Sequence, residues 1–223
     1  MLYELAWLLC STILRVFYGF RSYGRHNVPN TGGVILAINH ASFFDPVAAG
    51  CGMRRPVHFM ARDTLFVSLF GSMIRGLNAF PVKRGAGDTK ALKEYIARVR
   101  DGNVVMLFPE GTRTADGRIQ PLLSGVGMLA TRAGVPVVPT YIAGSFGAWS
   151  RHRSLPGHGQ ISIHYGAPIS VDRLDGESKR QHQERIRDTI AARLLEMEGR
   201  LCRMTDVRGD ARRGGPVAPA REG

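Results

Sequence analysis

A histidine and an aspartate five residues apart, His40 and Asp45, stand just after an apolar run at residues 34–38. On one continuous α-helix this spacing would point the two side chains about 140° apart, at roughly 3.6 residues per turn. His40 must therefore precede a helix for the pair to meet, and Ser42 with Asp45 resembles a capping box that would begin one. The carboxylate would then hold one imidazole nitrogen and leave the other free as a general base.

The same segment also allows a purely structural interpretation. Asp45 could serve only as the acidic partner of the capping box. A single histidine such as His40, placed after a strand, is often a hydrogen-bonded loop residue without a catalytic part. The segment taken alone leaves both interpretations open.

A second polar cluster, Phe-Pro-Glu-Gly-Thr-Arg at residues 108–113, also follows an apolar run. Proline ends strand pairing, and Gly111 lets the backbone approach a ligand closely. Arg113 could clamp a phosphate group through two parallel hydrogen bonds. The alternative is an exposed loop in which Glu110 and Arg113 are solvated or paired with each other at little gain in stability.

A third cluster, Lys83 and Arg84 beside Gly85, is basic and suits either a phosphate or a solvated turn. Across the chain, 30 Lys and Arg against 18 Asp and Glu give a net charge of +12. This balance favours an anionic partner: a phosphate-bearing substrate, lipid headgroups or nucleic acid. Nucleic acid is disfavoured, because the arginines are not interleaved with aromatic residues that could stack on bases.

The elements that must position these residues alternate along the chain. Expected strands lie at 34–38, 57–60, 79–82, 104–108, 137–142 and 161–165. Expected helices lie near 42, at 65–77, from a cap at Asp88 to Gly102, at 125–132, and late in the chain around Ile186, Ile190, Leu194 and Met197. The alternation predicts one α/β domain with a central, mostly parallel or mixed sheet flanked by helices, and places the site in loops at the strand ends. The apolar stripe at 65–77 fits core packing, an acyl-chain groove or a bilayer surface.

The first 22 residues have a different character. Residues 5–14 are apolar apart from Ser11 and Thr12, which is too short for the roughly 20 residues of a membrane span. Arginines follow at positions 15, 21 and 25. We expect an amphipathic helix that lies on an anionic membrane surface, peripheral or monotopic, with a core-packing first helix as the alternative.

Composition sets the remaining boundaries. A chain of 223 residues with 44% hydrophobic content can bury one sizeable core. We expect a membrane-associating helix at 1–22, the main domain at 23–203 and a disordered basic tail at 204–223, because the tail has little to bury. The cysteines at 10, 51 and 202 form no Cys-x-x-Cys motif, so we expect no metal and no cofactor, and a reduced, cytoplasmic setting.

Four ordered blocks resemble the glycerolipid acyltransferase family, most of all its 1-acylglycerol-3-phosphate acyltransferases. They are Asn39-His40 with Asp45, then residues 80–84, 108–113 and 135–139, and the likeness extends over residues 23–168. It implies transfer of a fatty acyl group from acyl-CoA or acyl carrier protein to the sn-2 hydroxyl of lysophosphatidic acid, which forms phosphatidic acid in phospholipid biosynthesis at the cytoplasmic face of the membrane. By the same resemblance His40 is the general base and Asp45 its orienting partner. The residues implied for the acceptor's glycerol phosphate are Lys83, Arg84, Glu110, Gly111, Thr112 and Arg113.

One block departs from the family pattern. Many relatives have Phe-Lys-x-Gly shortly after the third block, where this chain has Leu122-Leu123-Ser124-Gly125. The acceptor could therefore be another lysophospholipid or glycerol-3-phosphate. Two further alternatives are a thioesterase-like hydrolase and a non-catalytic basic protein that binds membranes.

Overall fold

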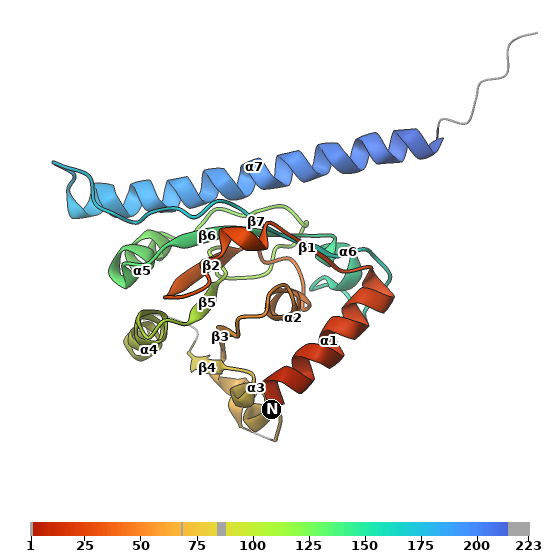
Figure 1. The fold of residues 1–223 in the computed structure, drawn as a ribbon, viewed down its shortest axis with the longest axis horizontal. Coiled ribbons are helices and arrows are strands. Elements are labelled where there is room, and N and C mark those ends of the chain that lie inside the picture. The colour runs from red at the N-terminus through yellow and green to blue at the C-terminus, as the bar shows by residue number, and fades with distance from the viewer. Residues whose placement is uncertain (1, 68, 84–87, 214–223) are drawn as a thin grey trace, which may run out of the picture.

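The fold is built on a seven-stranded mixed sheet, which confirms the predicted α/β class (Figure 1). A computed structural model describes residues 2–67, 69–83 and 88–213, with side chains for 2–67, 71–83 and 88–203. Within this part of the chain the strands follow the order β1-β7-β6-β2-β5-β3-β4. All neighbours are parallel except β6 and β7, which pair antiparallel. The strands are β1 (Arg21–Tyr23), β2 (Val34–Ile38), β3 (Val57–Arg62), β4 (Ala79–Val82), β5 (Val104–Leu107), β6 (Val137–Ala143) and β7 (Ser162–Tyr165).

Helices cover both faces of the sheet. Odd and even positions of β2 point to opposite faces, as strand geometry requires: Leu36 packs in a core with the first two helices, and Ile35 in a core with the fourth, fifth and last. The helices are α1 (Leu2–Tyr18), α2 (Asp45–Cys51), α3 (Leu69–Gly76), α4 (Thr89–Arg100), α5 (Gly125–Ala133), α6 (Ser145–Trp149) and α7 (Lys179–Arg213), with short 3-10 turns η1 (Arg25–Asn27) and η2 (Asp63–Phe66).

Parallel pairing brings the predicted site residues to one edge of the sheet. β2, β5, β3 and β4 run in the same direction and are adjacent in that order. The segments that leave their carboxyl ends therefore emerge side by side. His40 follows β2, the 108–113 cluster follows β5, and Lys83 follows β4.

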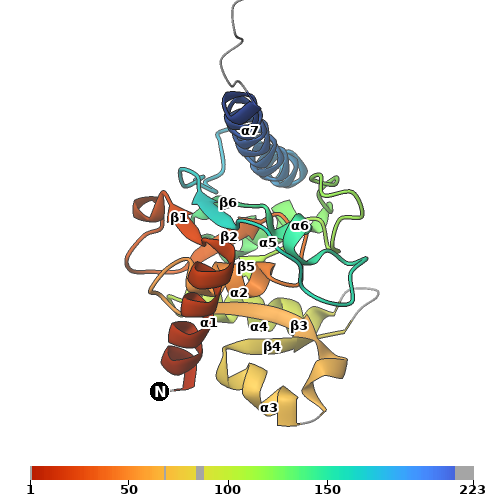
Figure 2. The ribbon, with the colours of Figure 1, turned by 90° about the vertical axis from the view of Figure 1, so that its right-hand side faces the viewer.

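Helix α1 crosses one side of the domain and has two different faces (Figure 2). Its inner face is anchored by the Trp7 indole, which donates to the Met53 carbonyl at 3.0 Å, and by the Tyr3 hydroxyl, which accepts the Val57 N–H at 3.0 Å. Its outer face leaves large apolar side chains exposed. None of the described helices combines the length and apolarity needed to cross a bilayer.

Helix α2 begins at Asp45, three residues later than the predicted start at Ser42. The acidic half of the predicted capping box is present, because Oδ2 of Asp45 accepts the Ser42 N–H at 2.7 Å, but the Ser42 hydroxyl accepts the Phe44 N–H rather than the Asp45 N–H. Pro46 lies in the first turn, where a missing N–H removes no helical hydrogen bond.

The last helix extends further than expected. α7 continues to Arg213, so residues 204–213 are helical where a disordered tail was predicted. Low hydrophobicity argues against a packed core, but this segment is also free of proline and therefore compatible with a helix. Residues 214–223 lie outside the described residues, and the prediction for them stays a prediction.

Candidate active site

The structure brings His40 and Asp45 into direct contact. Nδ1 of His40 lies 2.9 Å from Oδ2 of Asp45, and the carboxylate is fully buried. A carboxylate can only accept in this pair, so Nδ1 carries the proton and Nε2 has the free lone pair. No residue of the described ranges hydrogen-bonds to Nε2. The imidazole therefore has the orientation that a general base would need, and the predicted meeting of His40 and Asp45 is confirmed.

Two further contacts fix this pair. Oδ2 of Asp45 also accepts the backbone N–H groups of Ala41 and Ser42, each at 2.7 Å. The His40 ring stacks on Phe108, with 3.8 Å between ring centres and 15° between their planes. Neither the carboxylate nor the ring can turn without losing these contacts, so the base is preorganised.

The backbone of His40 is held by neighbouring strands. The buried side chain of Asn39 pairs with Ile142 of β6 in both directions: its Oδ1 accepts the Ile142 N–H at 2.7 Å and its Nδ2 donates to the Ile142 carbonyl at 3.2 Å. The His40 carbonyl accepts the Thr114 N–H at 2.8 Å. Sequence reasoning gave Asn39 no role of its own; a polar residue directly after a buried strand was the available signal.

Glu110 connects the two predicted clusters. Its Oε1 accepts the His40 N–H at 2.7 Å, and its Oε2 accepts the Gln120 N–H at 2.8 Å. Burial raises the pKa of Glu110 above its ordinary value, while these two backbone hydrogen bonds oppose that shift. Both carboxylate oxygens thus accept backbone N–H groups. Glu110 therefore links the loop after β2 to the loop after β5, and we refer to it as a brace between these loops.

Gly111 occupies a position that other residues would strain. Its φ is 72°, in the left-handed region, and a Cβ there would lie 2.5 Å from Cδ1 of Leu123. We expect Gly111→Ala to lower the free energy of unfolding by about 1–2 kcal/mol and to weaken acceptor binding, because the loop must shift. Thermal melts and steady-state kinetics would check both effects.

A second substitution separates the two causes. Adding Leu123→Ala to Gly111→Ala removes the steric contact and leaves only the backbone strain. The double variant should therefore recover part of the loss. Native stability and kinetics in Gly111→Ala would contradict the argument.

Arg113 and Thr112 lie at the rim of the site. The Arg113 guanidinium lies 3.6 Å from the centre of the Phe43 ring, and its backbone carbonyl accepts from Arg151. Thr112 is exposed. The rim therefore places the Arg113 cation against an aromatic ring of the His40 loop.

The basic cluster after β4 is only partly described. Lys83 is exposed, and its N–H is held by Asp88, the residue that caps α4. β4 lies two strands from β5, which corresponds to about 10 Å across the sheet. Arg84 lies outside the described residues, so its predicted part is untested.

Ser42 is the hydroxyl nearest in sequence to His40, but its hydrogen bonds exclude it as the partner of that base. Its Oγ donates to the Trp149 carbonyl at 2.8 Å and accepts the Phe44 N–H at 3.0 Å. Ser42 is therefore not placed to act as a nucleophile that His40 activates. No described group of three His, Cys, Asp or Glu residues is arranged to hold a metal ion.

An apolar pocket of about 110 Å³ lies beside the Asp45 end of α2. Its walls are the inner face of α1, the side of α2 and residues of β3 and β5, and they expose almost no polar atoms. The lining residues are Tyr3, Ala6, Trp7, Cys10, Pro46, Val47, Gly50, Cys51, Val57, Phe59, Leu77 and Met106. Such a pocket accepts hydrocarbon rather than a charged group.

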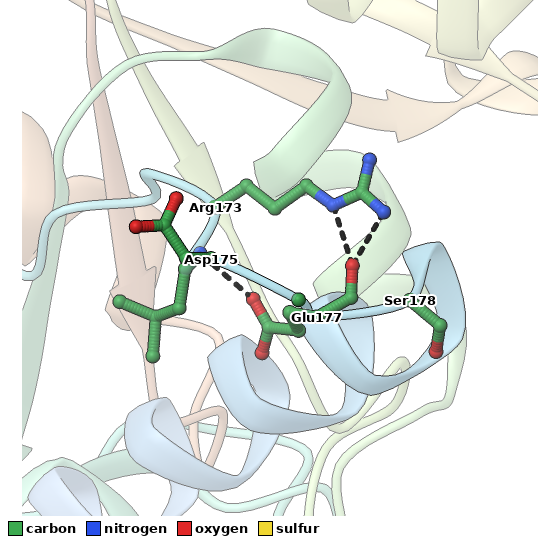
Figure 3. Close-up of a pocket in the computed structure, with 6 residues that line it drawn as sticks. Arg173, Asp175, Glu177 and Ser178 are labelled. Atoms are coloured by element: carbon green, nitrogen blue, oxygen red, sulfur yellow. Dashed lines mark hydrogen bonds between the residues drawn. The ribbon is translucent and has the colours of Figure 1, made fainter.

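A larger, open hollow of about 460 Å³ lies at the loop before α7, away from these residues (Figure 3). Arg173 donates to the Glu177 carbonyl, and Arg185 pairs with the Glu177 carboxylate at 2.7 Å. These hydrogen bonds from Arg185 lower the pKa of Glu177 to about 2. None of the predicted site residues lines this hollow, and its contacts are those of a helix-capping loop.

Comparison with known proteins defines the class. A family model for acyltransferases matches residues 19–143, and the chain belongs to that acyltransferase family. Among curated proteins, the chain is 26% identical to a 1-acyl-sn-glycerol-3-phosphate acyltransferase of Bacillus subtilis, over 86% of this chain and 96% of that protein. It is 28% identical to the chloroplastic 1-acyl-sn-glycerol-3-phosphate acyltransferase BAT2 of Brassica napus, of which it spans 51%.

The fold is shared with a solved structure. The crystal structure of the 1-acyl-sn-glycerophosphate acyltransferase PlsC from Thermotoga maritima superposes with a TM-score of 0.71, at 24% identity, over 88% of this chain and 79% of that one. This likeness extends the common fold beyond the segment that the family model matches.

Proposed function

We propose that this acyltransferase esterifies the sn-2 hydroxyl of lysophosphatidic acid with a fatty acyl group from a thioester donor, and so forms phosphatidic acid. The observation that carries the proposal is the 2.9 Å contact between His40 and the buried Asp45, which leaves Nε2 as a free base. The choice of acceptor is supported by the similarity to the Bacillus and Brassica 1-acyl-sn-glycerol-3-phosphate acyltransferases.

The reaction needs no acyl-enzyme intermediate. Nε2 of His40 takes the proton of the acceptor hydroxyl as its oxygen attacks the thioester carbonyl carbon. The tetrahedral intermediate then expels the thiolate, which takes the same proton from the imidazolium. Asp45 stabilises the imidazolium between these two steps, because a buried negative charge lies against Nδ1.

The acceptor's phosphate fits the rim of the site. Arg113 is a cation that contacts the His40 loop directly, through the ring of Phe43. Thr112 adds a hydroxyl and Gly111 an approachable backbone, while Glu110 acts through the loops that it braces. Lys83 and Arg84 would extend the positive charge toward the same edge of the sheet.

The donor's hydrocarbon chain fits the apolar pocket between α1 and α2. Pro46, one of its lining residues, directly follows Asp45 in the sequence, and the pocket is thus placed on the same short helix as the partner of the base. A volume of about 110 Å³ is below the roughly 300–1,000 Å³ of whole-ligand pockets, which suits part of an acyl chain. Acyl-CoA and acyl carrier protein both present such a chain on a thioester and remain alternative donors.

The test is an assay of the lipid product. Purified protein is incubated with palmitoyl-CoA or palmitoyl-acyl carrier protein and lysophosphatidic acid, and both thiol release and phosphatidic acid are followed. We expect equal amounts of the two products with at least one donor. 1-Acylglycerol, which lacks the phosphate, is the matched control acceptor and should react poorly.

Other outcomes would redirect the proposal. Thiol release without a lipid product would indicate a hydrolase. If product forms only with glycerol-3-phosphate or with another lysophospholipid, that compound is the acceptor instead. This outcome would agree with the leucine at position 123, where many relatives have a lysine. No turnover with any acceptor would favour a non-catalytic, membrane-binding protein.

The outer face of α1 suits the surface of an anionic membrane at the cytoplasmic side. Val16 and Phe17 are each 70% exposed, and Arg15 beside them is exposed as well. The end of α3 lies against the start of α1, at Gly76 and Leu2, and the segment of η2 and α3 has exposed apolar residues of its own. The exposed apolar residues of α1 and of this segment are Leu2, Leu5, Leu8, Leu9, Ile13, Val16, Phe17, Leu65, Val67 and Met73.

Replacement of Val16 and Phe17 by serine should release the protein from membranes. Each buried side chain of this size contributes roughly 1.5–3 kcal/mol to partitioning, so the double variant should bind at least about 100-fold more weakly. Co-sedimentation with vesicles that contain phosphatidylglycerol measures this. Leu155→Ser is the matched control, since Leu155 is 77% exposed but lies outside α1. Equal binding of both variants would refute the assignment.

A further inference from the structure

Glu198 of α7 reaches the loop that follows the 108–113 cluster. Its Oε1 accepts the N–H of Ile119 at 3.2 Å. Glu198 lies one turn beyond Leu194, a fully buried residue of α7, and therefore points toward the same face of the domain. The family model ends at residue 143, so this contact comes from a part of the chain that it does not cover.

The next residue of the loop is held by the site itself. Gln120 donates its N–H to Glu110 at 2.8 Å, and Glu110 in turn accepts the N–H of His40. Two successive amides, those of Ile119 and Gln120, are thus bound by two carboxylates from distant parts of the chain. One carboxylate belongs to α7, and the other braces the catalytic loop.

The loop is also closed on itself. Thr114 donates its hydroxyl to Asp116, and the Gln120 side chain donates to the same Asp116 oxygen at 3.0 Å. The Thr114 N–H is bound to the His40 carbonyl at 2.8 Å. The segment 114–120 therefore behaves as one unit, attached to the catalytic loop at its start and to Glu110 and Glu198 at its end.

The surroundings of Glu198 agree with a specific contact. Tyr141 of β6 is buried, and the charge of Glu198 adds to the effect of burial in raising the pKa of the tyrosine hydroxyl. The charge of Glu198 also contributes to the raised pKa of Glu110. The Glu198 carboxylate is thus close enough to interact electrostatically with both Tyr141 of the sheet and Glu110.

We propose that Glu198 is a positioning residue, which fixes the 114–120 loop so that Glu110 and the adjoining Arg113 are held in place for the acceptor's phosphate. The choice of lysophosphatidic acid as the substrate in this inference rests on the proposed function. The contact of Glu198 with the loop is independent of that function. The docking of α7 is secured separately by the buried Ile186, Ile190 and Leu194. Removing the carboxylate should therefore loosen the loop without detaching the helix.

The experiment compares Glu198→Ala with Glu198→Gln. The alanine variant should raise the KM for lysophosphatidic acid about 10-fold, the effect of losing one hydrogen bond to a charged group, with kcat changed less than about threefold. Glutamine keeps an acceptor oxygen for the Ile119 N–H, so it should restore most of the KM. Glu196→Ala, which removes an exposed carboxylate paired with Arg193 on the same helix, is the control and should behave as native protein.

Amide hydrogen exchange supplies a readout that needs no substrate. The peptide that contains Ile119 and Gln120 should exchange faster in Glu198→Ala than in native protein and Glu198→Gln, while peptides of α7 around Ile190 stay protected. If native protein fails to acylate lysophosphatidic acid, the proposed function is wrong. The role of Glu198 in fixing the loop is then decided by amide hydrogen exchange, which needs no substrate. Unchanged exchange at 119–120 would overturn the inference, as would equal losses in the alanine and glutamine variants.

Discussion

Replacement of His40 by alanine should lower kcat for phosphatidic acid formation by roughly 10²–10⁴-fold, the usual contribution of a general acid–base group. The substitution removes Nε2, the group that we propose takes the acceptor proton. KM for both substrates should change little, because the ring contacts Asp45 and Phe108 rather than the acceptor rim. The measurement is the steady-state rate of lipid product, with a thermal melt to show that the variant is folded.

His152→Ala is the matched control. His152 is an exposed histidine whose ring lies 3.0 Å from the Ala115 carbonyl, close to the same loops but away from Asp45. It should retain native kcat. Full activity in His40→Ala would favour the structural interpretation, in which His40 only holds a loop.

Asp45→Asn should lower kcat by up to about 10⁴-fold, the effect of the same change in the Ser-His-Asp triad. The amide oxygen can take the place of Oδ2 and still accept from Ala41, Ser42 and His40. The negative charge that stabilises the imidazolium is lost. The new NH₂ group would occupy the position of Oδ1, a buried atom with no hydrogen-bond partner in the described structure.

The loss of kcat in Asp45→Asn, compared with its loss of thermal stability, distinguishes a catalytic role of Asp45 from a role in ordering the start of α2. If Asp45 only ordered the start of α2, the asparagine variant would lose stability and activity in proportion. We expect a large loss of kcat with a modest change in melting temperature. A variant that melts much lower but has native kcat when folded would contradict a catalytic role for Asp45.

Much of the sheet could be predicted because its central strands are buried on both faces. Of these strands, β2 has the predicted bounds and β5 ends one residue before its predicted end, while the edge strand β4, which is only partly buried, also has its predicted bounds. Continuous apolar runs identify such strands. β1 was missed because Arg21–Tyr23 is short and half polar, and only its pairing with β7 makes it a strand.

The contact between His40 and Asp45 was within reach of the sequence, since both lie in one short segment. The brace by Glu110 was not, because it depends on which strands are neighbours. The adjacency of β2 and β5 would have placed residues 40 and 110 together. The start of α2 was predicted three residues too early, because residues 43 and 44 form a turn before the helix although Asp45 accepts the Ser42 N–H as predicted.

The side-chain contacts that assemble this site span large separations in sequence: Asn39 to Ile142 is 103 residues, His40 to Glu110 is 70, and Ile119 to Glu198 is 79. High contact order delays the formation of such contacts during folding, because long loops must close first. During synthesis, His40 and Asp45 leave the ribosome long before Glu110, Ile142 and Glu198, the residues whose contacts hold the surrounding backbone in place. Catalytic competence should therefore be acquired late, after α7 has docked, and a nascent chain should carry the motif without the activity.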